Sequence, residues 1–140
     1  VYASVDAYFQ DLDQIGQMVQ EEIGYVPCFI RFPGGSSNTV SKKYTAGIMS
    51  TLVQEVQNRG YQYYDWNGSS GDGSVRTTEE LVAQATSFDS NNIILLCHDS
   101  HGKQTTVEAL PQIIDYYRSQ GYTFKGLTVD SVAAHHGVNN

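Results

Sequence analysis

The stretch Val5–Phe32, VDAYFQDLDQIGQMVQEEIGYVPCFIRF, contains the unit that the rest of the chain repeats. Apolar residues recur at helical spacing from Val5 to Ile23. Gly24 follows, where a left-handed glycine commonly ends a helix. Residues 25–32 are then rich in aromatic and β-branched side chains, which are typical of a strand. The stretch therefore predicts a helix over 5–23 followed by a strand over 25–32.

The same order of helix, turn and strand recurs three more times. The turn residues at 24, 60, 91 and 121 lie 36, 31 and 30 positions apart, which is the length of one strand–helix unit. Such a repeat predicts a parallel sheet. The further helices carry the stripe Tyr44, Ile48, Leu52 and Val56 and the capping-box pairs Thr77–Glu80 and Thr105–Glu108; the further strands are 61–66, 93–98 and 122–129.

The fold class is therefore α/β, built of repeated parallel βα units. A closed barrel of eight such units needs about 250 residues, so 140 residues amount to roughly half of one. An open doubly wound sheet of four strands is the alternative, and it would be complete at this size. Either architecture places the chemistry at the carboxyl ends of the strands.

Composition excludes several classes of partner. Lys and Arg number 8 against 15 Asp and Glu, and the net charge of -7 argues against nucleic acid and anionic membrane surfaces. No apolar run reaches the roughly 18 residues of a membrane span, and the opening VYASVDAYFQ has no signal-peptide pattern. Cys28 and Cys97 both lie in apolar runs, which predicts two buried, unpaired thiols.

Three titratable residues close otherwise apolar strands: Arg31, Asp65 and His98. Each alone is more often structural than functional, but together at one rim they predict a site. An Asp beside a His fixes the imidazole tautomer and holds its proton. Trp66, next to Asp65, offers a flat ring that suits the apolar face of a sugar.

Other chemistries fit the sequence less well. Cys97 and His98 are neighbours on a strand, so their side chains point to opposite faces. The Gly/Ser loops 34–38 and 68–74 could bind phosphate, but both lack the spacing of phosphate-binding and dinucleotide-binding loops. The histidine pairs have no third ligand near them, so the chain has no metal-ligand spacing of its own.

At these strand ends the sequence resembles the polysaccharide deacetylases, the NodB-homology carbohydrate esterases, and in particular peptidoglycan N-acetylglucosamine deacetylases. FIRFPGGS is similar to the family's third motif, YYDWN to the fourth and ILLCHD to the fifth, in the proper order. The resemblance implies that residues 1–140 are the C-terminal part of one catalytic domain, about half of a distorted (β/α) barrel. The family's first two motifs, which supply a catalytic base and metal ligands, are expected upstream of Val1.

The resemblance also implies roles for individual residues. Arg31 would orient the catalytic base, Asp65 would tune the catalytic histidine, and His98 would be the general acid. Trp66 and Leu96 would line the substrate groove. Gly34 stands where many members have Tyr, and its backbone N–H would help hold the oxyanion. Gln62 replaces an Asp of the fourth motif.

The activity implied is metal-dependent removal of N-acetyl groups from an N-acetylglucosamine polymer, with peptidoglycan favoured over chitin. The metal, commonly zinc, would polarise the amide and its bound water. The family also implies an extracellular or cell-surface location and association with the N-terminal half of the same domain. Two alternatives stay open: a carbohydrate-binding or scaffold fragment without the metal half, and a small phosphate-binding α/β protein.

Overall fold

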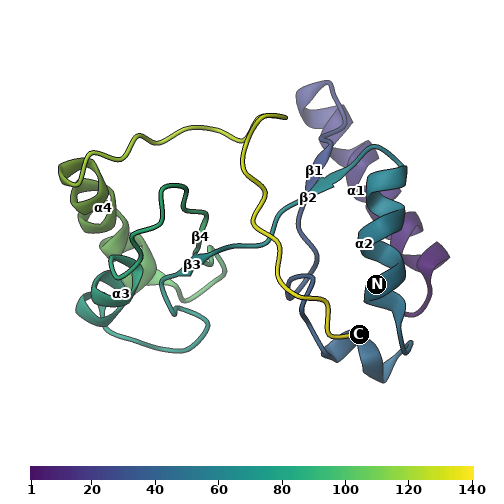
Figure 1. Cartoon of the computed structure of the whole chain (residues 1–140), viewed down its shortest axis with the longest axis horizontal. Helices are drawn as coiled ribbons and strands as arrows, with labels where there is room; N and C mark the ends of the chain where they lie inside the picture. The colour runs from purple at the N-terminus through teal and green to yellow at the C-terminus, as the bar shows by residue number, and fades with distance from the viewer. The chain divides into compact units, whose positions relative to one another are not determined.

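The computed structural model describes all 140 residues, in the order α1, β1, η1, α2, β2, β3, α3, β4, α4 (Figure 1). The chain divides into two compact units. The first unit comprises Val1–Asp65 and His135–Asn140, and the second comprises Trp66–Ala134. Each unit contains two helices of eight residues or more and one pair of short parallel strands.

The first unit begins with α1, Val5–Ile23, whose bounds are those expected from the apolar spacing. Ser4 caps its N-terminus by accepting a hydrogen bond from the Ala7 N–H, and Gly24 ends it at a φ of 85°. The 3₁₀ helix η1 spans Val40–Lys43, and α2 spans Ile48–Asn58. Strands β1, Phe29–Ile30, and β2, Gln62–Tyr63, pair in parallel, with Phe29 opposite Gln62 and Ile30 opposite Tyr63.

The core of the first unit lies between its helices and its strand pair. Phe32, Met49, Leu52 and Val56 are completely buried there. The spacing of four between Leu52 and Val56 puts both on the face of α2 that packs inward. The remaining buried members of this cluster are Tyr2, Tyr8, Phe9, Ile48 and Tyr63.

The last six residues of the chain, 135–140, return to the first unit. Asn140 replaces the missing side-chain cap of α2: its Oδ1 accepts from the Gly47 N–H and its carbonyl accepts from the Ser50 N–H, both at 2.8 Å. The His135 ring stacks on Tyr63 with 3.9 Å between centroids. The N-terminus of α2 thus depends on residues that lie about ninety positions further along the chain.

The second unit contains β3, Gly68–Ser69, α3, Thr78–Ala85, β4, Leu95–Leu96, and α4, Gln104–Ser119. Strands β3 and β4 pair in parallel, with Gly68 opposite Leu95 and Ser69 opposite Leu96. Helices α3 and α4 pack against each other (Figure 1). Their shared core is the cluster Leu81, Ala85, Ala109, Ile113 and Tyr117.

The helix predictions are largely confirmed, with two exceptions. The capping box of Thr77 and Glu80 is present, whereas the one expected at Thr105 is absent because α4 begins at Gln104 after Lys103. Glu108 instead accepts a hydrogen bond from Thr78. Tyr44 follows η1 and is exposed, so the helical stripe starts at Ile48.

The strand predictions needed more correction. The parallel pairing is confirmed, but each strand has only two residues, and β3 forms inside the predicted Gly/Ser loop 68–74. Residues 122–129 form no strand. Both cysteines are unpaired as predicted, but Cys28 is exposed and Cys97 half-buried, so the prediction of full burial was wrong. The class of mixed helices and parallel strands stands. None of the helices combines the length and apolar character of a membrane span.

Candidate active site

The candidate site of the second unit lies at the carboxyl ends of β3 and β4. Parallel pairing brings these ends together, so residues just beyond them can meet. Gly68 allows the close pairing, because a Cβ there would lie 3.1 Å from Phe88 and 3.2 Å from Leu95. Asp72 follows β3 by three residues, and His98 follows Leu96, the last residue of β4, by two.

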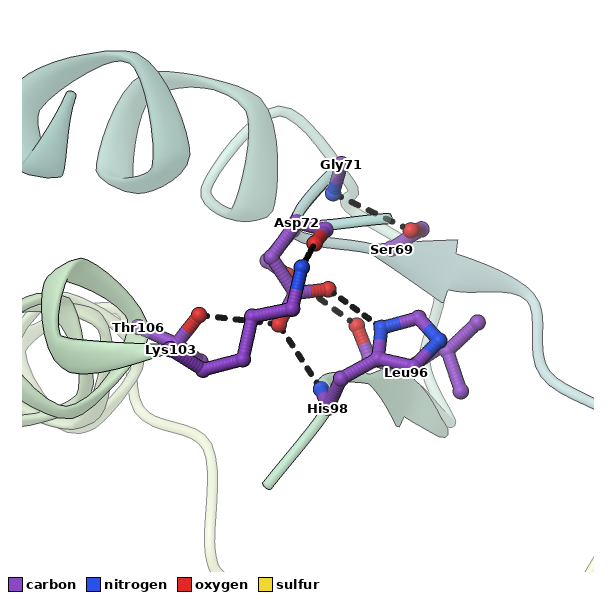
Figure 2. Close-up of polar contacts among 8 residues, drawn as sticks. Ser69, Gly71, Asp72, Leu96, His98, Lys103 and Thr106 are labelled. Atoms are coloured by element: carbon purple, nitrogen blue, oxygen red, sulfur yellow. Dashed lines mark hydrogen bonds and ion pairs between the residues drawn. The ribbon is translucent and has the colours of Figure 1, made fainter. Parts of the chain in front are cut away.

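His98 and Asp72 form the central contact of this site (Figure 2). Nδ1 of the imidazole lies 2.7 Å from Oδ1 of Asp72, and the backbone N–H of His98 donates to Oδ2 at 2.7 Å. An ionised carboxylate only accepts hydrogen bonds, so Nδ1 carries the hydrogen in this pair. Side chain and main chain of His98 are therefore held by one carboxylate.

Asp72 is ionised at neutral pH. Its burial by itself raises the pKa, but hydrogen bonds from the His98 ring, the His98 N–H, Thr106 and Ser70 outweigh burial and lower the pKa to about 2. Asp72 is 1% exposed, so water contributes little to holding this charge. The negative charge of Asp72 is therefore stabilised by the hydrogen bonds that it accepts.

Thr106 in the first turn of α4 and Lys103, the residue just before α4, supply two further contacts to Asp72 (Figure 2). The hydroxyl of Thr106 donates to Oδ2 at 2.9 Å, and the ammonium group of Lys103 donates to the Asp72 carbonyl. On the other side, Ser70 connects the two strands, since its N–H and its hydroxyl both donate to the Leu96 carbonyl. The Asp72 loop is thus fixed by both the sheet and the helix.

The arrangement suits proton transfer at the outer nitrogen of the ring. The His98 side chain is 43% exposed, in contrast to the 2% of Asp72. With Nδ1 anchored, Nε2 is the nitrogen that can meet a bound molecule, and a carboxylate on the inner nitrogen stabilises an imidazolium that donates from the outer one. A histidine held in this way can serve as a general acid or a general base.

Asp65 has different partners, all in the first unit. Its Oδ1 accepts from the Ser36 N–H at 2.8 Å, and its Oδ2 accepts from the Ser36 hydroxyl at 2.5 Å and from the His136 N–H at 2.8 Å. Burial raises the pKa of Asp65, but the hydrogen bonds from His136 and Ser36 outweigh it and lower the pKa below its ordinary value. Asp65 therefore joins the Gly/Ser loop to the C-terminal segment.

The other predicted site residues are divided between the two units. Arg31 and Gly34 follow β1 in the first unit, both exposed, and Gly34 has a φ of 77°. Trp66 and Leu96 belong to the second unit and are half-buried. The convergence of Arg31 and Asp65 with His98 stays a prediction. Within the second unit, Leu96 and His98 do lie together, on either side of Cys97.

Sequence reasoning missed Asp72, Lys103 and Thr106. The carboxylate bonded to Nδ1 of His98 is Asp72, rather than Asp65 as the sequence suggested. Asp72 stands in a Gly/Ser-rich stretch, GSSGDGS, that was interpreted as a loop alone. One signal was available: it is the only titratable residue there, and the loop follows a predicted strand.

The residues present do not form a metal site. No group of three or more His, Cys, Asp or Glu side chains gathers closely enough to hold an ion. Cys97 is not an activated thiol either. Burial raises its pKa, Asp72 raises it further, and the hydrogen bond with Ser70 only partly opposes them.

Parallel strands that alternate with helices, with a histidine and a carboxylate beyond the strand ends, place the chain in the α/β class. No family model matches the chain. The catalytic domain of a peptidoglycan N-acetylglucosamine deacetylase from Eubacterium rectale is similar in structure, with a TM-score of 0.94 and 45% identity over 99% of this chain and 64% of that domain. A Streptococcus mutans CE4 esterase matches 78% of this chain and 48% of its own, at 27% identity and a TM-score of 0.62.

Among curated proteins, a bifunctional xylanase/deacetylase of Pseudobutyrivibrio xylanivorans is 36% identical over 124 residues. That match covers 86% of this chain and 19% of the enzyme. The resemblance is thereby confirmed: this chain is related to the polysaccharide deacetylases and matches part of their domain. It spans about two-thirds of the E. rectale domain and about a fifth of the P. xylanivorans enzyme.

Proposed function

We propose that this chain carries the general-acid part of a polysaccharide N-deacetylase. The observation that carries the proposal is the His98–Asp72 pair, with an exposed imidazole whose inner nitrogen is anchored to a buried carboxylate. An amine is a poor leaving group unless it is protonated as the C–N bond breaks. In its imidazolium form, His98 would give the Nε2 proton to that nitrogen and keep the proton on Nδ1, a step that typically contributes 10²–10⁴-fold.

Further site residues complete the proposal. Arg31 would orient the catalytic base, Gly34 would offer its N–H to the oxyanion, and Trp66 and Leu96 would line the sugar groove. Asp65 would help to tune the catalytic histidine, as the resemblance implies, in addition to Asp72. The proposed divalent metal, zinc by resemblance, would be held by residues outside residues 1–140.

The proposed substrate is an N-acetylglucosamine polymer, with peptidoglycan preferred over chitin. Support comes from the E. rectale domain, which carries the name of a peptidoglycan N-acetylglucosamine deacetylase. An enzyme of this substrate would work at the cell surface or outside the cell. A binding module alone would need Trp66 and its neighbours but not an anchored, exposed histidine, so that alternative is not favoured.

Acetate release measures this function directly. The whole protein, loaded with zinc, is incubated with peptidoglycan and with chitin oligomers, and released acetate is measured. We expect release from peptidoglycan to be faster. Acetate release from chitin alone would contradict peptidoglycan as the proposed substrate. No acetate release from either polymer would contradict the deacetylase proposal.

We further propose that residues 1–140 are the C-terminal part of one catalytic domain and bind its N-terminal half. Residues 122–129 pair with no strand, and residues 122–128 together with Ile93–Leu95 border an open groove of about 1120 Å³. Phe124, Leu127 and Val129 are 56%, 43% and 84% exposed. Apolar surface of this kind is typical of a face that another segment covers.

Thermal melting of residues 1–140 alone and of the whole protein tests this arrangement. We expect the whole protein to melt cooperatively and to protect the amides of residues 122–129 from hydrogen exchange. The isolated chain should melt broadly. A monomeric 1–140 chain that melts cooperatively would contradict the proposal and favour the open sheet.

A further inference from the structure

Thr106 is a polar residue at an apolar position. The buried residues of α4 are Thr106, Ala109, Ile113 and Tyr117, at spacings of three and four that place them on the face packed against α3. Thr106 is 3% exposed. A buried hydroxyl without a partner destabilises the folded state, so a threonine here requires an acceptor. That acceptor is Oδ2 of Asp72, at 2.9 Å.

The hydroxyl fixes the orientation of the carboxylate. Oδ2 accepts from Thr106 and from the His98 N–H, while Oδ1 faces the His98 ring (Figure 2). Rotation of the carboxylate away from Nδ1 would break the bond to Thr106. Lys103, three residues earlier on the same helix end, holds the main chain of Asp72 through its carbonyl. Thr106 and Lys103 therefore hold the side chain and the backbone of Asp72, the residue that orients His98.

The geometry points to Thr106 as a positioning residue for His98, acting through Asp72. Its hydroxyl bonds neither the imidazole nor the exposed nitrogen Nε2, so it has no direct part in proton transfer. Its effect is to keep Asp72 facing Nδ1, which keeps the hydrogen on Nδ1 of the neutral ring and aims Nε2 outward. This role rests on the proposed general acid.

Three substitutions in the whole protein test the role. Thr106→Val keeps the shape and removes the donor, Thr106→Ser keeps the donor, and Thr105→Val is the matched control, because Thr105 makes no hydrogen bond to Asp72. The readouts are kcat and KM for acetate release from peptidoglycan, and the ¹⁵N chemical shifts of the His98 ring, which report its tautomer. Thermal melting confirms that each variant is folded.

We expect Thr106→Val to lower kcat roughly ten- to hundredfold with KM little changed, since a hydrogen bond to a charged group is lost. The neutral His98 ring should then become a mixture of tautomers. Thr106→Ser and Thr105→Val should stay within about twofold of the unmodified protein, as expected where the hydroxyl is retained or makes no contact. Should Thr106→Val fail to fold, Thr106→Ala, which also lacks the donor, takes its place.

Two outcomes overturn the positioning role. One is a folded Thr106→Val or Thr106→Ala protein that keeps both its kcat and the Nδ1–H tautomer. The other is a Thr106→Ser protein as impaired as Thr106→Val. If the unmodified protein releases no acetate, the proposed function fails, but the tautomer comparison still decides whether Thr106 positions His98.

Discussion

Oδ1 of Asp72 lies 2.7 Å from Nδ1 of His98, although the two residues are 26 positions apart in the sequence. The contact exists because β3 and β4 pair in parallel, so the residues that follow them lie at the same edge of the strand pair. A half-exposed imidazole is thereby joined to a buried carboxylate whose pKa is about 2. Because Asp72 occupies Nδ1, Nε2 is the ring nitrogen available for the proposed proton donation.

Replacement of His98 by Asn should lower kcat for acetate release by roughly 10²–10⁴-fold, the usual contribution of a general acid, and leave KM little changed. His101→Asn is the matched control. His101 lies on the same exposed loop, three residues further, and makes no hydrogen bond to Asp72. Equal losses in both variants would show that the loop as a whole matters, rather than proton donation by His98.

Paired substitutions of Asp72 and Asp65 by Asn should separate their roles. Asp72→Asn removes the charge facing Nδ1, so the ¹⁵N shifts of the His98 ring should change and kcat should fall. Asp65→Asn should leave the His98 tautomer unchanged, because Ser36 and His136 occupy its oxygens. A His98 tautomer that responds to Asp65→Asn and not to Asp72→Asn would restore Asp65 as the tuning carboxylate.

Asp72 should make the second unit sensitive to acid. A carboxylate whose pKa falls from 3.8 to about 2 on folding stabilises the folded state above pH 3.8, and that stabilisation is lost as the pH falls towards 2. The contribution is about 2 kcal/mol at neutral pH. Urea unfolding at pH 7 and pH 2.5, monitored in the second unit, should show a smaller pH effect in Asp72→Asn.

The matched control for this measurement is Asp115→Asn, at an exposed position on α4. It should retain the full pH dependence of the unmodified protein. A pH dependence that is identical in Asp72→Asn and in the unmodified protein would mean that Asp72 is not stabilised by folding.

Gly71 should not tolerate a side chain, whereas Gly73 should. Gly71 has a φ of 78°, and a Cβ there would lie 2.4 Å from Oε1 of Gln84, which accepts a hydrogen bond from Arg76. Left-handed backbone costs a non-glycine residue roughly 1–2 kcal/mol, and Gln84 would have to move. Gly71→Ala should therefore lower the free energy of unfolding by about that amount.

Gly71→Ala should also lower kcat, because Asp72 is the next residue. At Gly73 a Cβ would meet no atom within 4 Å and φ is not positive, so Gly73→Ala should change neither stability nor kcat measurably. Equal effects of the two substitutions would contradict the local explanation and indicate a general intolerance of the loop.

Periodic patterns predicted the helices well, since a stripe of apolar residues and a terminal glycine act locally. The bounds of α1 matched the expectation, and so did the capping box at Thr77. The pairing of Asp72 with His98 could not be predicted in this way. It depends on where β3 forms, and a strand of only Gly68 and Ser69 has no side-chain pattern from which it could be predicted.

The predicted roles of Arg31, Gly34 and Trp66 rested on motif resemblance, because an arginine, a glycine and a tryptophan at strand ends have many structural uses. Asp65 follows β2 by two residues, but its hydrogen-bond partners could not be predicted from the sequence. Ser36 and His136 reach it from 29 and 71 positions away, and separations of that size leave no local pattern.

The cap that Asn140 provides for α2 has a consequence for the order of events during synthesis. The chain is synthesised from its N-terminal side, so α2 and the loop around Asp65 leave the ribosome long before residues 135–140. Until those residues leave the ribosome, the Gly47 and Ser50 N–H groups have no capping acceptor from Asn140, and Asp65 lacks one of its donors. The second unit is one continuous stretch, Trp66–Ala134, and can form before residues 135–140 join the first unit.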